Sequence, residues 1–336
     1  MAVAHKKLSP SLAKRAAYPK FFVPALCQLI AEPFDDAETF FEVKFDGVRA
    51  LAFKKGPKVS LVTRRGNDIS YQFPEIAAAV ARLPYKNFVL DGEITAISNT
   101  NILGFQDIQP RLGIGTDEDI STLVTKHPVA FFVFDLPYFE GRSFVRVPFI
   151  ERKNFLERVV PKKGLVQFVP AVPKTGKKFF RLMMQKGFEG MVAKHAESEY
   201  VAGTRIWQKI KGNNQQEFII CGWTEGKGAR NDVFGALILG THDPKTKKLI
   251  HMGNVGTGFN DQMLLDLMKK FRKLERQTSP FETYGLMAAR PHWMRPQFVC
   301  EVKYAEVTRD VKLRKPVFVG LRVDKKPKDV ILERPK

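Results

Sequence analysis

The chain has 336 residues, 44% of them hydrophobic, which allows one large domain or two ordinary ones with a real core. Lysine and arginine total 55 against 35 acidic residues, and the formal net charge of +20 favours a polyanionic partner, nucleic acid ahead of an anionic membrane. Three widely spaced cysteines without CxxC spacing argue against a disulfide framework or a zinc site, and no stretch approaches the length of a membrane span.

The N-terminal 20 residues are basic and lack the apolar core of a secretory signal. We therefore expect a mobile basic arm on a soluble, cytoplasmic protein that does not bind a membrane. From residue 21 to about 210, the pattern predicts short strands interleaved with a few helices. The strand-like runs after the first lie at residues 51–55, 58–64, 87–97, 129–139 and 190–195. The clearest helices are residues 75–83 and 177–187, and the second ends at Gly187 as a plausible C-cap.

A polar break, KGNNQQ at residues 211–216, separates this part from a second region. Five strand-like runs follow, at residues 217–224, 234–243, 248–259, 298–308 and 316–325. An amphipathic helix at 261–274 follows the third run, with Leu264, Met268 and Phe271 on one face. This order predicts a small Greek-key barrel of the oligonucleotide-binding (OB) type, with the helix closing one end.

The run FFEVKFDGVRAL, at residues 40–51, places a lysine inside an apolar strand. Side chains alternate along a strand, so Glu42, Lys44 and Asp46 share one face while Val43 and Phe45 share the other. Taken alone, Lys44 is a strand lysine paired with Glu42 or Asp46. A lysine whose pKa is lowered by burial and nearby cations is instead a nucleophile.

Motifs around this lysine resemble those of a known superfamily. KFDGVR (44–49) resembles the KxDGxR signature of the covalent nucleotidyltransferases, which include DNA ligases, RNA ligases and mRNA capping enzymes. The other elements follow in the family's order: TRRG (63–66), DGE (91–93), FVFD (132–135), EGMVAK (189–194), WQKIK (207–211) and RVDK (322–325). The resemblance spans about residues 21–331. Segments 31–50, 104–112 and 301–325 are most similar to bacterial ATP-dependent DNA ligases of the end-joining type.

The resemblance implies an α+β fold in two domains after the arm at 1–20. A nucleotidyltransferase (adenylation) domain, with ATP-grasp-like antiparallel sheets and flanking helices, would occupy residues 21–212. An OB-fold β-barrel domain would occupy residues 213–336, which agrees with the strand pattern.

The resemblance also implies roles for individual residues. Lys44 would carry AMP, with Asp46 as the second catalytic residue. The residues that would bind ATP are Glu42, Lys44, Arg49, Arg64, Glu93, Phe134, Lys194, Arg205, Lys209, Lys211, Arg322, Asp324 and Lys325. Phe134 would stack on adenine, Lys194 and Lys209 would contact the α-phosphate, and Glu93 and Glu189 would hold a divalent cation. Arg65 remains an alternative to Arg64.

Strand alternation independently places Lys209 and Lys211 on one face of WQKIK. Taken alone, that run is an ordinary half-exposed basic strand. If both lysines converge on a phosphate near Lys44, we expect their charge to lower its pKa.

The resulting prediction is an ATP-dependent DNA ligase that seals 5′-phosphate/3′-hydroxyl nicks through lysyl-AMP and DNA-adenylate intermediates. It would use ATP and Mg²⁺, with Mn²⁺ as a substitute, and act as a monomer on nicked double-stranded DNA in a bacterial cytosol, with a Ku-type end-binding protein as a further partner. The alternatives are an RNA ligase or capping-type nucleotidyltransferase, and a non-catalytic OB-containing DNA-binding protein. The sequence leaves open whether the pathway is repair, recombination, end joining, replication or mobile-element maintenance.

Overall fold

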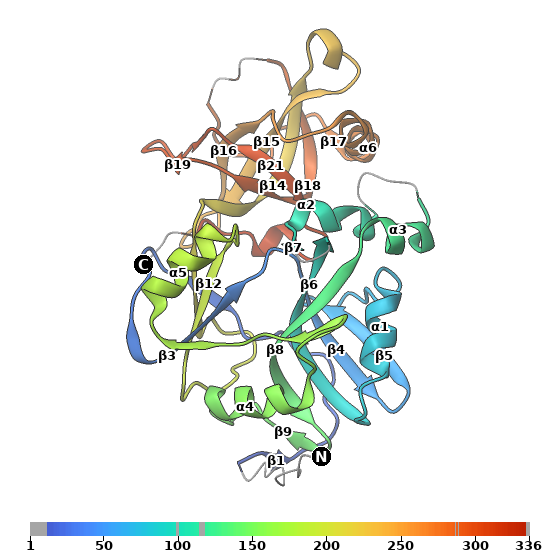
Figure 1. Cartoon of the computed structure of the whole chain (residues 1–336). Coiled ribbons are helices and arrows are strands. Elements are labelled where there is room, and N and C mark those ends of the chain that lie inside the picture. The colour runs from blue at the N-terminus through green and yellow to red at the C-terminus, as the bar shows by residue number, and fades with distance from the viewer. Residues whose placement is uncertain (1–11, 99–100, 114–117, 286, 288, 334–336) are drawn as a thin grey trace. The chain divides into compact units, whose positions relative to one another are not determined.

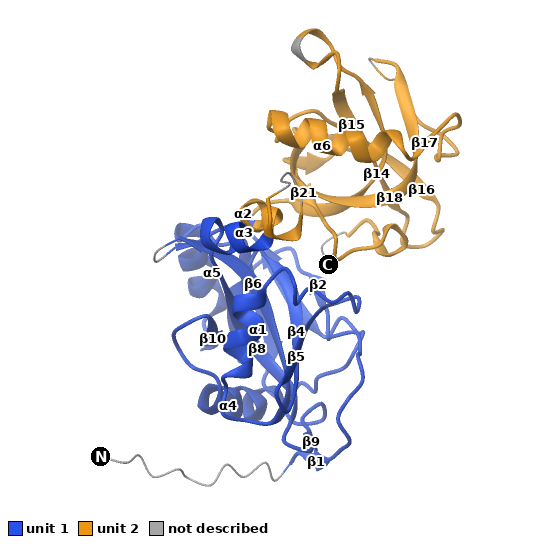
Figure 2. Ribbon diagram, turned by 90° about the vertical axis from the view of Figure 1, so that its right-hand side faces the viewer, with its two compact units in different colours: residues 1–104, 120–212, 336 blue, residues 105–119, 213–335 orange. Residues whose placement is uncertain are grey.

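The computed structural model describes residues 12–98, 101–113, 118–285, 287 and 289–333 (Figure 1). The chain divides into two compact units (Figure 2). The first contains residues 1–104 and 120–212, and the second contains residues 105–119 and 213–335. The chain leaves the first unit for the second within the polar break, after Gly212.

The segment at 105–119 differs from the expected domain ranges, because it groups with the second unit. It contains α2 (Phe105–Ile108) and a 3₁₀ helix (Gln109–Leu112). The buried amide of Gln109 donates to the Val319 carbonyl oxygen at 2.7 Å. A Cβ on Gly320 would lie 2.1 Å from the Gln109 amide nitrogen, so glycine is required for this close approach.

Two sheets form the first unit (Figure 1). The larger is ordered β1-β9-β8-β6-β4-β5, with β7 beside β6 and β10 beside β8. Its strands are β1 (Lys14–Arg15), β4 (Val48–Lys55), β5 (Lys58–Thr63), β6 (Asn87–Ser98), β7 (Asn101–Ile102), β8 (Val129–Phe139), β9 (Arg142–Ser143) and β10 (Val166–Phe168). The smaller sheet is ordered β11-β3-β12-β13-β2. Its strands are β2 (Cys27–Leu29), β3 (Asp36–Lys44), β11 (Val172–Lys174), β12 (Gly190–His195) and β13 (Trp207–Lys211).

Helices flank these sheets: α1 (Pro74–Ala81), α3 (Ile120–Lys126), α4 (Phe149–Val159) and α5 (Gly176–Gln185). Of these, α1 and α5 match the two predicted helices. The apolar side of α5, which includes Phe179 and Met183, packs on Phe41, Met191 and Ile210 of the smaller sheet. That packing covers one face of β3, β12 and β13, and the charged residues therefore lie on the other face.

Residues 12–20 are not a free arm, unlike our expectation for the first 20 residues. Lys14 and Arg15 pair antiparallel with Ser143 and Arg142 of β9. Tyr18 packs edge-on against Tyr138, with ring centroids 5.3 Å apart. The pairing with β9 and the contact between the two tyrosine rings therefore hold this segment in place. The basic composition of the segment gave no sign of either interaction. Residues 1–11 lie outside the described part of the chain.

A barrel dominates the second unit. Its sheet is ordered β16-β15-β14-β18-β17, with β21 beside β18. Its strands are β14 (Gln215–Glu225), β15 (Phe234–His242), β16 (Leu249–Val255), β17 (Glu275–Arg276), β18 (Pro291–Lys303) and β21 (Val317–Leu321). The backbone N–H of Phe318 on β21 donates to the Thr257 carbonyl just after β16, at 2.9 Å, which links the two ends of the sheet.

The predicted helix is α6 (Asp261–Arg272), which buries Leu264, Leu267 and Phe271 in the barrel core. Outside the main sheet lie a small hairpin, β19 (Glu306–Val307) with β20 (Leu313–Arg314), and 3₁₀ turns at Gly228–Arg230 and Pro327–Asp329. The predicted fold class, an α+β nucleotidyltransferase-type unit followed by an OB barrel, is confirmed. Among the described residues, no helix is both long and apolar enough to cross a membrane.

Candidate active site

Three neighbouring strands of the smaller sheet bring the predicted lysines together. Gly190 of β12 lies opposite Lys44 of β3 on one side and opposite Lys211 of β13 on the other. A Cβ on Gly190 would lie 2.0 Å from the Ile210 carbonyl oxygen, so only glycine allows β13 this close. Register thus places Lys44 and Lys211 on either side of one short stretch of backbone.

Lys44 and Lys211 share the carboxylate of Glu189, the residue before β12. Lys44 donates to Oε2 of Glu189, and Nζ of Lys211 lies 2.9 Å from Oε1. The partner of Lys44 is therefore Glu189, 145 residues away, rather than Glu42 or Asp46 as the local pattern suggested. Strand pairing sets this contact, and local spacing does not reveal it.

This arrangement favours the charged form of Lys44. Burial lowers the pKa of Lys44, but the neighbouring Glu189 carboxylate more than offsets that effect, so the pKa is raised above its ordinary value. Our expectation of a lowered pKa was wrong for this state of the protein. The charge of Lys211 does act in the expected direction, but it is outweighed. For Glu189, burial raises the pKa, yet Lys211 and Lys44 bring it down to about 2.

A second carboxylate, Glu42, also holds two lysines. It is buried with only 2% of its surface exposed. Lys153 of α4 donates to Oε1 of Glu42, and Nζ of Lys194 on β12 lies 2.7 Å from Oε2. Both lysines are buried. Sequence reasoning identified Lys194 and Glu42 but missed Lys153, which lies in a helix that we did not predict.

Aromatic rings surround the amino group of Lys194. Its Nζ lies 4.0 Å from the ring centroid of Trp207 and 4.7 Å from that of Phe134. The guanidinium of Arg49 lies over the same two rings, at 5.3 and 5.2 Å. Cations over ring faces are stabilised by the quadrupole of the ring. Phe134 is only half-buried, and its predicted role in stacking on adenine stays a prediction.

Arg49 is fixed by a buried carboxylate. Its guanidinium makes two hydrogen bonds to Asp91, at 2.9 and 2.6 Å, and the Tyr200 hydroxyl donates to Asp91 Oδ2 at 2.6 Å. Burial lowers the pKa of Arg49, but Asp91 outweighs it and the pKa is raised. The sequence reasoning gave Asp91 and Tyr200 no role, although both hold a predicted ATP ligand in place.

The remaining predicted residues of the first unit lie on nearby strands and turns. Glu93 lies opposite Arg49 in the pairing of β4 with β6, and its charge helps to raise the pKa of Lys44. Lys209 lies opposite Val192 of β12. Asp46 follows β3, Arg64 and Arg65 lie in the turn after β5, and exposed Arg205 donates to the Cys27 carbonyl at 3.1 Å.

Glu189 fits a divalent cation poorly while both lysines hold it. The charges of Glu93 and Glu189, the two predicted metal ligands, both raise the pKa of Lys44, so both carboxylates lie near its ammonium group. Glu189 is already neutralised by two lysines, which would repel a metal ion. Carboxylate oxygens are the ligands that Mg²⁺ prefers, together with phosphate oxygens of a bound nucleotide.

The RVDK residues form a separate cluster in the second unit. Arg322 makes two 2.8 Å hydrogen bonds to Asp324 and one of 2.7 Å to Glu301. Lys325 lies 2.9 Å from Glu217. Asp324 is 2% exposed, so the group is a buried network rather than a surface ion-pair cluster.

The carboxylates set the charge states of this network. Burial lowers the pKa of Arg322, but Asp324 and Glu301 raise it well above the ordinary value. For Asp324, burial raises the pKa, and Arg322 more than reverses that effect. Burial thus does not neutralise Arg322 or Asp324, because each favours the charged form of the other.

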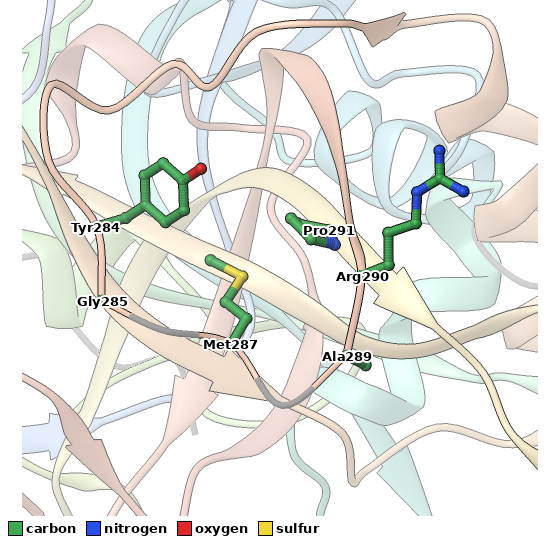
Figure 3. A pocket seen from close by; sticks show the side chains of 6 residues that line it. All are labelled: Tyr284, Gly285, Met287, Ala289, Arg290 and Pro291. Carbon is green, nitrogen blue, oxygen red and sulfur yellow. The ribbon is translucent and has the colours of Figure 1, made fainter.

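A pocket of about 480 Å³ lies elsewhere in the second unit (Figure 3). Six residues line it: Tyr284, Gly285, Met287, Ala289, Arg290 and Pro291. None of the predicted site residues is among them, and Arg290 is the only charged side chain in this lining. The pocket therefore carries no part of the predicted chemistry.

Comparisons with known proteins agree with this architecture. Residues 23–211 match the family model of the ATP dependent DNA ligase domain, and residues 230–325 match that of the ATP dependent DNA ligase C terminal region. The chain is 32% identical over 326 residues to the multifunctional non-homologous end joining protein LigD of Mycolicibacterium smegmatis, covering 95% of this chain and 41% of that protein. It is likewise 32% identical over 323 residues to LigD of Pseudomonas aeruginosa, covering 94% of this chain and 37% of that protein.

A solved structure of a mycobacterial DNA ligase D complexed with ATP and MES is also similar. Its TM-score is 0.63 at 28% identity, covering 92% of this chain and 98% of that one. The chain spans less than half the length of the two LigD relatives. With both family models matched in order, the chain belongs to the ATP-dependent DNA ligase family.

Proposed function

We propose that this chain is an ATP-dependent DNA ligase that seals nicks bearing a 5′-phosphate and a 3′-hydroxyl. Lys44 Nζ attacks the α-phosphorus of ATP, which forms a P–N bond and releases pyrophosphate. The AMP group then passes to the 5′-phosphate of the nick and frees the lysine. Finally, the 3′-hydroxyl attacks that phosphate and releases AMP, which closes the backbone.

One observation carries the proposal: four lysines gather around two buried carboxylates at the predicted nucleophile. A triphosphate brings about four negative charges and needs cations and hydrogen-bond donors around it. The excess of lysine over glutamate at Lys44 meets that need. A structural strand lysine would need one counter-ion and no further cations.

Sharing Glu189 with Lys211 makes it easier to release Lys44 for attack. Only the neutral amine is nucleophilic, and the contact with Glu189 favours the ammonium. Lys44 therefore has to leave Glu189 and lose its proton. Because Lys211 also contacts Glu189, that carboxylate remains neutralised when Lys44 moves to the phosphate. Lys211 thereby reduces the cost of freeing the nucleophile.

Other residues would bind the nucleotide. Lys194 and Lys209 would contact the α-phosphate, and Phe134 would stack on adenine. The remaining ligands to ribose, base and phosphate would be Glu42, Arg49, Arg64 and Arg205. Glu93 would hold Mg²⁺, or Mn²⁺ in its place, together with phosphate oxygens, and the bound ion would supply charge neutralisation for each phosphoryl transfer.

The RVDK cluster would act only while ATP is present. Arg322, Asp324 and Lys325 would approach the β- and γ-phosphates and orient pyrophosphate for departure. DNA later needs the same space, so the second unit would then move away about the polar break at 211–216. The three RVDK residues would therefore serve the first step and not the sealing step.

The substrate would be nicked duplex DNA, held through the phosphate backbone by a chain of net charge +20. The two LigD relatives are named as non-homologous end joining proteins, which supports a role in end joining. We also propose a Ku-type end-binding protein as a partner, a monomeric state and a bacterial cytosolic location. Experiments in the organism that produces this protein would test the end-joining role, the Ku-type partner, the monomeric state and the cytosolic location.

The decisive experiment compares nucleotides and nicked substrates. Purified protein is incubated with labelled ATP or GTP, and then with nicked DNA or nicked RNA of the same sequence. We expect a covalent adduct from ATP, none from GTP, and sealing of DNA. Adduct formation from GTP, or sealing of RNA alone, would favour a capping-type enzyme or an RNA ligase. DNA binding without any adduct would favour a non-catalytic DNA-binding protein.

A further inference from the structure

Lys153 is a buried cation that the proposed reaction does not yet use. It lies on α4 and is 5% exposed. Its amino group donates to Glu42 Oε1 and lies 4.8 Å from the ring centroid of Phe168. A fully enclosed lysine is costly unless its charge has a partner, so its contact with Glu42 is an essential one.

The two lysines on Glu42 are bound differently. Lys153 makes a hydrogen bond to the carboxylate. Lys194 lies 2.7 Å from the other oxygen, but its amino group is out of line for any hydrogen bond. It faces the rings of Trp207 and Phe134 instead. The ammonium group of Lys194 is thus ion-paired with Glu42 but keeps N–H donors that an acceptor on a ligand can use.

The charges around Glu42 leave a buried excess of one positive charge. Arg152 and Asp135 form a balanced pair with two hydrogen bonds, at 2.8 and 2.9 Å. The carboxylate of Glu42 then balances only one of Lys153 and Lys194. An anion arriving at Lys194 would compensate for the other charge.

We propose that Lys153 is the resident counter-ion of Glu42, a positioning residue that frees Lys194 to bind the nucleotide phosphate. This inference rests on the proposed function. Without Lys153, movement of Lys194 to the nucleotide would leave the buried carboxylate of Glu42 without a counter-ion. Lys194 would therefore stay with Glu42 and bind the nucleotide less well. The glutamate thus always keeps one lysine while the other is exchanged between carboxylate and phosphate.

The test uses three variants of the full chain and the rate of AMP-adduct formation against ATP concentration. Lys153→Met should raise the KM for ATP by about tenfold, the factor expected when ~1.4 kcal/mol of binding is lost. Lys153→Arg should keep the wild-type KM. Glu42→Gln combined with Lys153→Met should recover part of the loss, because no carboxylate then retains Lys194. A purely structural role for Lys153 would lower the melting temperature without this rescue.

A second measurement does not depend on the folding of the Met variant. Burial lowers the pKa of Lys153 to about 8, with a further contribution from the Lys194 charge. The charged groups that face Lys153 are Glu42 on β3, Lys194 on β12 and Asp135 on β8, and Asp135 is itself paired with Arg152. The KM for ATP should therefore rise between pH 7 and 9 in the wild type, and rise less in Lys153→Arg.

The two proposals fail separately. If the wild type forms no AMP adduct, the proposed function is wrong. If it does, and Lys153→Met folds with an unchanged KM, the counter-ion role is overturned. An identical pH dependence of KM in wild type and Lys153→Arg would overturn it as well.

Discussion

In the ion pairs around Glu42 and Glu189 of the first unit, four lysines share two carboxylates, whereas in those of the RVDK cluster two cations share three carboxylates. The first group is Lys44, Lys153, Lys194 and Lys211 with Glu42 and Glu189. The second is Arg322 and Lys325 with Asp324, Glu301 and Glu217. Even when nearby Glu93 is counted, the first group keeps an excess of positive charge.

The difference indicates how each cluster would meet a triphosphate. The first cluster has more cations than carboxylates, so an anion can bind there and compensate for the excess positive charge. In the second cluster, Arg322 is already satisfied by Asp324 and Glu301, so a phosphate has to compete with buried carboxylates. We therefore propose that the first cluster is prepared for nucleotide and that the second has to rearrange before it can act on one.

The largest expected effect comes from the first cluster. Lys44→Ala should reduce AMP-adduct formation to background, because no other lysine lies in a KxDGxR context. The fold should survive, since Lys44 is at the end of β3 and 20% exposed. Labelled ATP and a denaturing gel measure the adduct. Lys58→Ala, an exposed lysine on β5, is the matched control and should behave as wild type.

Substitutions in the RVDK cluster should impair the first step of the reaction, self-adenylation, and leave the sealing step intact. Arg322→Ala, Asp324→Ala and Lys325→Ala should each slow self-adenylation by about 10²-fold, the usual cost of removing one well-placed charge-stabilising group. Sealing of a nick that already carries 5′-AMP should be largely spared, because that substrate contains no pyrophosphate. Equal failure on both substrates, or normal charging with AMP, would contradict a role confined to the first step.

Increasing salt should weaken DNA binding, which depends on the overall charge, more than it slows AMP-adduct formation, which depends on the local clusters. DNA affinity depends on all the cations that displace counterions, so log affinity should fall with log salt at a slope of about −0.9 per phosphate neutralised. AMP-adduct formation depends on buried ion pairs, which salt screens less. Fluorescence anisotropy with nicked duplexes of two sequences measures the slope, and the two sequences should differ little. A flat salt response, or strong sequence preference, would argue against binding through the DNA backbone.

The prediction with the least effect on the reaction itself concerns stability. The pKa of Lys153 is lowered to about 8 in the folded state, below its unfolded value, so folding disfavours its charged form. Between pH 8 and 10.5 the unfolded chain binds more protons at this site, and stability should therefore rise with pH. Over that pH range, the free energy of unfolding of the wild type should rise by at most about 3 kcal/mol relative to that of Lys153→Met. Urea unfolding at several pH values measures the difference, and a wild type that loses stability relative to the variant would reverse the assigned sign.

Strand alternation was enough to predict which side chains share a face. It placed Lys44 with Glu42 and Lys209 with Lys211, and the structure keeps the apolar residues Phe41 and Ile210 on the opposite face, under α5. The approximate positions of the barrel strands β14, β15, β16, β18 and β21 along the chain followed in the same way from short apolar runs and turns. Periodicity reports such local geometry reliably because a side chain's face is fixed by its own strand.

Contacts between distant segments could not be predicted in the same way. Glu189 meets Lys44 through the pairing of β12 with β3, and this register has no local signature. Helix α4 was missed because its buried face includes Arg152 and Lys153, which blur the apolar stripe that marks a helix. The sign of the pKa shift on Lys44 was wrong for the same reason, since it depends on a carboxylate that the local sequence does not reveal.

The most direct test of the account is to identify the lysine that carries AMP. The protein is incubated with ATP and Mg²⁺, digested, and its peptides are mapped by mass spectrometry under conditions that preserve the P–N bond. We expect a single AMP group on the peptide that contains Lys44, and none after pyrophosphate is added to reverse the reaction. AMP on any other lysine, or an unmodified protein that still seals nicked DNA with ATP, would contradict it.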